Sequence, residues 1–160
     1  GMAYQAPRLL PWRTAVQNVA VGQEIAGVAK SEREANARHW LDKMHLEDAY
    51  DLVPSQLSGG MRQRVSLARA FAVKPDLLLM DEPFVSLDPD LVEDMMQLFV
   101  RLRAAHQVTT LLVTHVEAEA QRLASRIVTL GGTPGQIISD VQNKGAYFQL
   151  SASGVTSSKS

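Results

Sequence analysis

Two short stretches of this sequence combine residue types that suit phosphate chemistry, and one predicted helix separates them. The first is the tetrapeptide LSGG, in which Ser58 is a good helix N-cap and the two glycines let a ligand approach the backbone closely. The free N–H groups at a helix start, with the positive end of the helix dipole, favour an anion. We therefore expect an anion-binding loop here. The helix that follows is expected to end near Lys74, because Pro75 disfavours helical geometry in the residue before it.

The second stretch is an acidic pair at the end of a short apolar run. Residues 77–80 are LLLM, and Asp81 and Glu82 follow them before Pro83. Such a run predicts a strand buried on both faces, with the two acids at its carboxyl end, where open α/β sheets place ligands. Neighbouring strand residues point to opposite faces, so one carboxylate can hold a hydrated magnesium ion while the other orients an attacking water. Taken alone, the pair is equally well explained as a solvated strand end.

Taken together, several groups of residues resemble the ATP-binding subunits of ABC transporters. LSGGMRQR, LLLMDEP, Ser86-Leu87-Asp88 and Thr114-His115 are similar, in order and spacing, to the signature, Walker B, D-loop and switch-histidine motifs of that family. Gln5 and the PRLLPW run after it resemble the Q-loop of importers for nitrate, sulfonate, taurine and similar small solutes. The resemblance covers about residues 3–140. It implies an α/β fold, namely a partial P-loop NTPase core with a helical signalling subdomain.

The resemblance also implies a role for each candidate site residue. In catalysis, Glu82 would be the general base, His115 would contact the γ-phosphate, and Gln5 would sense the magnesium ion and the attacking water. The magnesium ion would be held by Asp81, with Gln5 beside it. Nucleotide contacts across a dimer of two ATPase subunits would come from the signature and D-loop residues Ser58, Gly59, Gly60, Gln63 and Asp88.

The family pattern places a phosphate-cradling loop upstream of Gln5, and only four residues precede Gln5 here. We therefore expect a chain truncated at its amino end that binds ATP and Mg²⁺ weakly or not at all by itself. Residues 22–27 have the glycine spacing of such a loop, but Val28 and Ala29 occupy the positions of its lysine and hydroxyl residue, so a surface helix is the better interpretation.

An alternative interpretation of the whole chain is a catalytically dead remnant of a truncated gene, acting at most as a binding or interaction module. The genomic sequence upstream of Met2 separates the two, since an in-frame phosphate-binding loop indicates a cloned fragment and a stop codon indicates a remnant.

Chromosome-maintenance ATPases share the motifs but insert long coiled coils, whereas no sustained heptads lie between Gln5 and Leu57. Two departures from the family, Val116 and Ser125 at common aspartate positions, put full activity in doubt.

The amino-acid composition limits the size of the core and the classes of function that the chain can have. With 46% hydrophobic residues, a chain of 160 residues can bury one core. A formal net charge of -1 gives no basic footprint for nucleic acid, and the absence of cysteine excludes disulfides and thiolate metal sites. No apolar run reaches the roughly 18 residues that span a bilayer. The family resemblance implies a cytoplasmic subunit, peripheral on the inner face of the cell membrane, that meets an integral permease subunit through residues 5–12.

The remaining elements follow from capping and periodicity. We expect four segments: a Q-loop remnant over 1–13, a helical subdomain over 14–73, the carboxyl-terminal part of the α/β core over 74–140 and a mobile tail over 141–160. Capping boxes at Thr14-x-x-Gln17 and Ser31-x-x-Glu34 predict helices, the first running to about Ala29. Further elements are predicted as a short helical piece over 47–51, a helix from Asp88-Pro89, a buried strand over 109–114, and a hairpin of 126–130 with 136–140.

The sheet itself carries one more expectation. In the related ATPases, the switch-histidine strand lies between the Walker B strand and the phosphate-loop strand. Without the latter strand, residues 110–113 would expose an unpaired row of backbone groups. Either the hairpin moves across to fill the gap, or a second copy of the chain supplies a strand, and we favour self-association.

Overall fold

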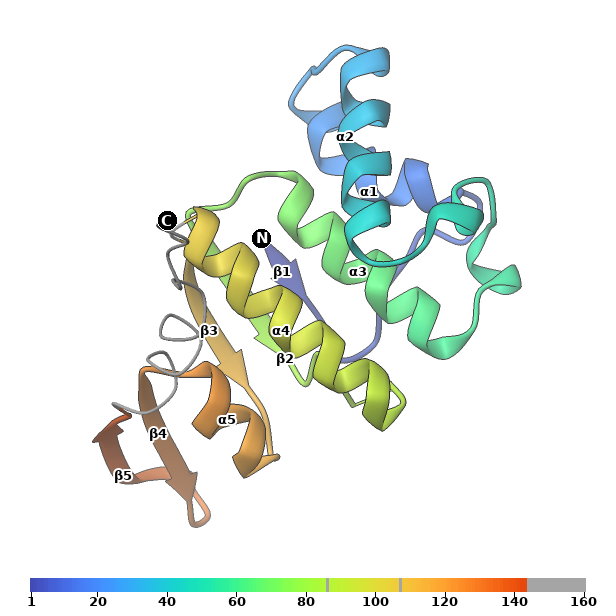
Figure 1. The fold of residues 1–160 in the computed structure, drawn as a ribbon. Coiled ribbons are helices and arrows are strands. Elements are labelled where there is room, and N and C mark those ends of the chain that lie inside the picture. The colour runs from blue at the N-terminus through green and yellow to red at the C-terminus, as the bar shows by residue number, and fades with distance from the viewer. Residues whose placement is uncertain (86, 107, 144–160) are drawn as a thin grey trace, which may run out of the picture. The chain divides into compact units, whose positions relative to one another are not determined.

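The computed structural model describes residues 1–85, 87–106 and 108–143 (Figure 1). The chain divides into two compact units, of which the first is Gly1–Val113 and the second begins at Thr114. The helical segment expected over 14–73 packs with the sheet inside the first unit and does not separate from it. The observed boundary therefore lies within the segment expected over 74–140.

A parallel three-stranded sheet organises the first unit. Its strands are β1 (Met2–Ala3), β2 (Leu77–Asp81) and β3 (Thr109–Val113), in the order β1-β2-β3. Leu77 pairs with Thr109 and Asp81 with Val113, so the carboxyl ends of the two longer strands are level. The predicted α/β class is confirmed, because parallel strands joined through helices form this sheet.

The two faces of the sheet differ, which corrects the predictions that β2 is buried on both faces and that β3 is a buried strand. On one face Leu78 and Met80 are fully buried, and Figure 1 shows α4 crossing the strands. On the other face Leu77, Leu111 and Val113 are about half exposed. Consecutive apolar residues in a strand place apolar side chains on both of its faces. Whether a helix covers each face depends on the rest of the fold. Among the described residues of this unit, helices cover one face only.

Three helices form a lobe beside the sheet: α1 (Ala15–Ile25), α2 (Lys30–Lys43) and α3 (Gly59–Ala72). The Thr14 capping box is confirmed, but α1 ends at Ile25, before a left-handed Gly27 with φ of 78°. The predicted Ser31 capping box is wrong. The helix α2 already begins at Lys30, with Ala29 as an N-cap that makes no side-chain hydrogen bond, so Ser31 lies inside the first turn.

Between α2 and α3 lie two short 3₁₀ turns, η1 (Glu47–Ala49) and η2 (Pro54–Gln56). The first agrees with the short helical piece predicted over 47–51. The helix α3 ends at Ala72, two residues before Lys74, as expected for a chain that meets Pro75. The helix α4 (Pro89–His106) begins at the predicted proline.

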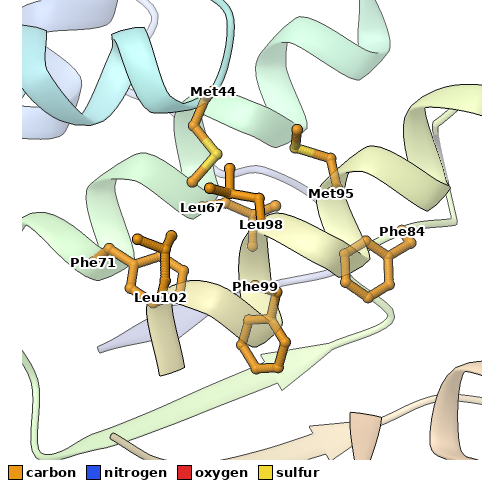
Figure 2. Close-up of a pocket in the computed structure, with 8 residues that line it drawn as sticks. All are labelled: Met44, Leu67, Phe71, Phe84, Met95, Leu98, Phe99 and Leu102. Carbon is orange, nitrogen blue, oxygen red and sulfur yellow. The ribbon is translucent and has the colours of Figure 1, made fainter. Parts of the chain in front are cut away.

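The core of the first unit lies where α3 and α4 meet. The Phe71 ring stacks on Trp40 with 5.2 Å between centroids and lies 6.3 Å from the Phe99 ring. A gap of about 10 Å³, room for about one water, remains there (Figure 2). Its lining is entirely apolar, so the gap is a feature of core packing and not a ligand site. The lining residues are Met44, Leu67, Phe71, Phe84, Met95, Leu98, Phe99 and Leu102.

The second unit contains α5 (Glu117–Leu123) and an antiparallel hairpin of β4 (Arg126–Gly131) and β5 (Gln136–Gln142), which confirms the predicted hairpin. Its two strands form a sheet of their own, so among the described residues β3 has only β2 as a strand neighbour. Val141 and Gln142 still belong to β5, so the tail expected from residue 141 does not begin there. The rest of that expected tail, from residue 144, lies outside the described residues. No helix in the described ranges is both long and apolar enough to cross a membrane.

Candidate functional site

The acidic pair lies at the carboxyl end of β2, the middle strand of the sheet. Asp81 is the last residue of the strand and is exposed. The next residue, Glu82, has a left-handed backbone with φ of 47°, and its N–H donates to the Val113 carbonyl at 2.9 Å. Left-handed geometry is costly for a residue other than glycine and concentrates at functional sites. The chain thus turns sharply out of β2 at Glu82, and the hydrogen bond to Val113 of β3 holds the Glu82 backbone in place.

A magnesium ion suits this strand end. In the described ranges, no three His, Asp or Glu side chains gather into a cluster that could hold a metal ion. Mg²⁺ does not need such a cage, since it keeps several waters and takes one or two carboxylates together with substrate phosphates. The exposed carboxylate of Asp81 is a donor of this kind.

The predicted anion-binding loop has the expected local geometry. Ser58 is the N-cap of α3, with φ of -65° and ψ of 167°, and its Oγ accepts a hydrogen bond from the Met61 N–H at 3.2 Å. Gly59 is exposed, and a Cβ added to it would meet nothing nearer than an Arg62 nitrogen at 4.0 Å. The space above the helix start is therefore open to a ligand, and Gly60 continues the first turn.

Gln63 lies differently from the nucleotide contact predicted for it. Its side chain is fully buried, and its Nε2 donates to the Tyr4 carbonyl at 3.3 Å. The amide therefore faces the segment that carries Gln5 and not the solvent at the start of α3.

Gln5 leaves the sheet at the same edge as the acidic pair. It follows β1 by two residues, and Ala3 of β1 pairs with Met80 of β2 in a parallel register. The side chain of Gln5 is exposed. Trp12, farther along the same loop, is 73% exposed, so the loop presents a large aromatic side chain to solvent.

Asp88 and His115 lie in different units. Asp88 is exposed at the start of α4, and its carbonyl accepts from the Val92 N–H at 2.9 Å. The neighbouring Ser86 of the predicted D-loop lies outside the described residues. His115 is exposed and follows β3 by two residues, at the beginning of the second unit. The structure thus brings Gln5, Asp81 and Glu82 to one sheet edge of the first unit, and His115 belongs to the second unit.

The residue before His115 is fixed by a hydrogen-bonded pair that sequence reasoning missed. The Thr114 hydroxyl donates to Glu119 Oε2 at 2.6 Å and accepts from the Val116 N–H at 3.0 Å. Glu119 is 6% exposed, which is unusual for a glutamate without a partner. The only sign of this pair in the sequence is that Thr114 stands five positions before Glu119.

Two more side chains with structural importance were missed, Asn18 and Arg69. Both donate to backbone carbonyls of residues 7–14. The available signal was a polar residue on an otherwise apolar stretch, since Asn18 lies among Val16, Val19 and Ala20.

Comparison with known proteins agrees with this geometry. Residues 1–85 match a family described as ABC transporter. The chain is 43% identical to the taurine import ATP-binding protein TauB of Pseudomonas putida, covering 89% of this chain and 54% of the relative. It is 42% identical to the glycine betaine/proline betaine transport system ATP-binding protein ProV of Salmonella typhimurium, covering 89% of this chain and 37% of the relative.

The fold also matches solved structures. A dimeric ATP-binding cassette in a post-hydrolysis state, bound to ADP and Pi, superposes with a TM-score of 0.83 at 32% identity, covering 91% of this chain and 63% of that one. The present chain therefore spans about half the length of the curated taurine import relatives and less of the betaine transport relative.

Proposed function

The chain belongs to the ABC transporter family, and we propose that it forms part of the ATP-binding subunit of an importer that couples ATP hydrolysis to solute uptake. The relatives support the proposal, because two of them are a taurine import ATP-binding protein and a betaine transport ATP-binding protein. Solute selectivity in such systems belongs to other subunits, so the transported solute is not part of the proposal.

The chemistry that we propose centres on the end of β2. Glu82 is the general base that takes a proton from the attacking water, and the hydrogen bond from its N–H to the Val113 carbonyl fixes the backbone from which the side chain projects. Asp81 would hold the magnesium ion, which neutralises charge on the phosphates when it is bound. Gln5, at the same sheet edge, orients the attacking water by its amide. His115 donates to the γ-phosphate and so stabilises charge that develops during transfer.

A second ATPase subunit completes the site in this proposal. The open start of α3, at Ser58, Gly59 and Gly60, would bind the phosphates of ATP held by the opposite subunit, with free N–H groups and the helix dipole as the attractive elements. Asp88 would link the two sites. The dimeric state of the matched solved cassettes supports this arrangement.

A membrane permease is the other proposed partner. The loop from Gln5 to Trp12 carries the exposed Trp12 ring and two half-buried leucines, and exposed apolar groups of this kind suit a protein–protein contact. The subunit would then lie on the inner face of the cell membrane through its partner.

The observation that carries the proposal is the placement of Asp81 and Glu82 at the carboxyl end of the middle parallel strand, with Glu82 bonded to β3. The test is Mg²⁺-dependent ATP hydrolysis by this chain joined to the phosphate-binding segment of a taurine import relative. We expect hydrolysis that stops when the metal is chelated. Absence of hydrolysis and of ATP binding would instead favour the interaction-module alternative.

A further inference from the structure

The loop between β1 and α1, residues 4–13 and here called the linking segment, forms no helix or strand. Its backbone groups therefore need partners from other elements. Figure 1 shows the chain running from the end of β1 alongside α3 and on to α1. Side chains from these two helices provide the partners.

The first half of the linking segment is held by Arg69 of α3. One guanidinium nitrogen donates to the Pro7 carbonyl at 2.8 Å, and the other donates to the Arg8 carbonyl at 2.9 Å. Burial lowers the pKa of Arg69, yet an arginine stays protonated in proteins, so both hydrogen bonds are charge-assisted. A planar fork that contacts two successive carbonyls fixes both position and direction of the backbone.

The backbone that Arg69 contacts is strained. Arg8 has φ of 45°, in the left-handed region that costs a residue other than glycine roughly 1 kcal/mol or more. The Arg8 guanidinium lies over the Tyr4 ring at 4.7 Å, so the segment folds back on itself. The Arg69 fork stabilises this turn, and the Gln63 amide holds the Tyr4 carbonyl from the same helix.

The second half of the linking segment is held by α1. Asn18 is fully buried, and its Oδ1 accepts from the Leu10 N–H at 2.7 Å. Its Nδ2 donates to the carbonyls of Leu10, Arg13 and Thr14, at distances from 2.9 to 3.2 Å. Both halves of the segment are therefore hydrogen-bonded to the packed helices α1 and α3, and the segment that carries the exposed Trp12 is anchored on the helix that Ser58 caps.

We propose that Arg69 is a positioning residue that locks the linking segment onto α3, so that a displacement of the segment moves the Ser58 loop with it. Arg69 lies roughly 16 Å from Ser58 along one continuous helix, at 1.5 Å per residue. The consequence for transport rests on the proposed function, because it takes the segment as the permease contact. The locking itself is a property of this chain and is tested without a permease.

The chain offers a matched control in Arg64, on the same helix. Its Nη1 donates to the Met44 and His45 carbonyls at 2.7 and 2.9 Å, and His45 is left-handed with φ of 54°. Arg64 and Arg69 are thus partly buried arginines of α3 that each contact two successive carbonyls ending in a left-handed residue. They hold different segments, so substitutions at the two positions separate local positioning from a general loss of helix packing.

The experiment is amide hydrogen exchange on the full chain, read at Leu10 and Arg13, whose N–H groups are hydrogen-bonded within the held segment. In Arg69→Met we expect exchange at both amides to rise roughly tenfold or more, as for the loss of a charge-assisted hydrogen bond. Exchange at the Leu46 amide, beside the Arg64 contact, is expected to stay unchanged. Arg64→Met should show the reverse pattern.

Equal acceleration at Leu10 in both variants, or no acceleration in Arg69→Met, would overturn the proposal. Far-UV circular dichroism checks that each variant is folded. Should Arg69→Met not fold, Arg69→Lys carries the test: a single ammonium cannot contact two carbonyls as a fork does, so the Leu10 amide must exchange faster than in the unaltered chain.

The transport consequence is measured in the importer assembled with its permease. There Arg69→Met should remove most of the stimulation of ATP hydrolysis by solute, measured as the ratio of the rates with and without solute for the same variant, so that a change in the unstimulated rate through Gln5 cancels. Unchanged stimulation would contradict the consequence. If this chain joined to a phosphate-binding segment hydrolyses no ATP, the proposed function fails, whereas the exchange result still decides whether Arg69 locks the segment.

Discussion

The N–H of Glu82 donates to the carbonyl of Val113 at 2.9 Å, and this hydrogen bond extends the pairing of β2 and β3 by one residue beyond Asp81. It joins the acidic pair to the strand that leads to His115. A carboxylate on a left-handed residue would otherwise be poorly fixed, because nothing in the strand geometry defines its direction. The strand pairing therefore fixes the backbone position from which the proposed general base projects.

Nucleotide affinity of the isolated chain should be low. The 160 residues contain no phosphate-binding lysine loop, since residues 22–27 fall in α1 and the turn after it. We expect Mg-ATP to bind no tighter than about 1 mM, or about -4 kcal/mol. Isothermal calorimetry measures this directly, and a micromolar dissociation constant would refute the prediction.

Ser58→Ala should destabilise the first unit by about 1 kcal/mol, because the Met61 N–H loses its partner at the N-cap. Urea denaturation measures the change in the free energy of unfolding. The control is Ser31→Ala, where the serine lies inside α2 and caps nothing, so a change within about 0.5 kcal/mol is expected. Equal losses for the two variants would show that the cap geometry is not responsible.

Asn18→Ala should cost about 2–4 kcal/mol, because the buried amide serves one N–H and three carbonyls at once. Denaturation in urea is again the measurement. Gln17→Ala, one position away and exposed, should cost about 1 kcal/mol or less. A loss in Asn18→Ala no larger than that of its neighbour would contradict the role assigned to the amide.

The outer edge of β3 should make the chain self-associate at micromolar concentration. Among the described residues β3 pairs only with β2, and Leu111 on its open face is 58% exposed. Leu111→Lys should lower the associated fraction in light scattering. The control is Ile25→Lys, which removes an 83% exposed side chain from a helix without an unpaired strand edge. A strictly monomeric unaltered chain would overturn the prediction.

The sequence predicts those features of the fold that rest on local chemistry. Ser58, Thr14 and Pro89 mark helix starts correctly because capping and proline geometry act within a few residues. The Ser31 prediction failed because four residues matched a capping box, whereas the observed N-cap is Ala29, two residues earlier. A short sequence pattern predicts the type of a secondary-structure element better than it predicts the residue at which the element begins.

Long-range relationships were harder to predict. Gln63, Arg69 and Asn18 act on backbone carbonyls far along the chain or across a turn, and a carbonyl carries no residue type that a sequence pattern can show. The half-exposed face of β2 and β3 was missed because an apolar run does not say which face a helix will cover. The hydrogen bond between Glu82 and Val113 likewise depends on a strand register that no local pattern specifies.

Single-turnover hydrolysis tests whether Glu82 is the general base of an ATPase site. In this chain joined to a phosphate-binding segment, Glu82→Gln should lower the hydrolysis rate by roughly 10²-fold or more while ATP stays bound, because the amide cannot accept the proton. Asp76→Asn, before the opposite end of β2, serves as the matched acidic control and should hydrolyse ATP within about twofold of the unaltered rate. Undiminished hydrolysis in Glu82→Gln would contradict the account.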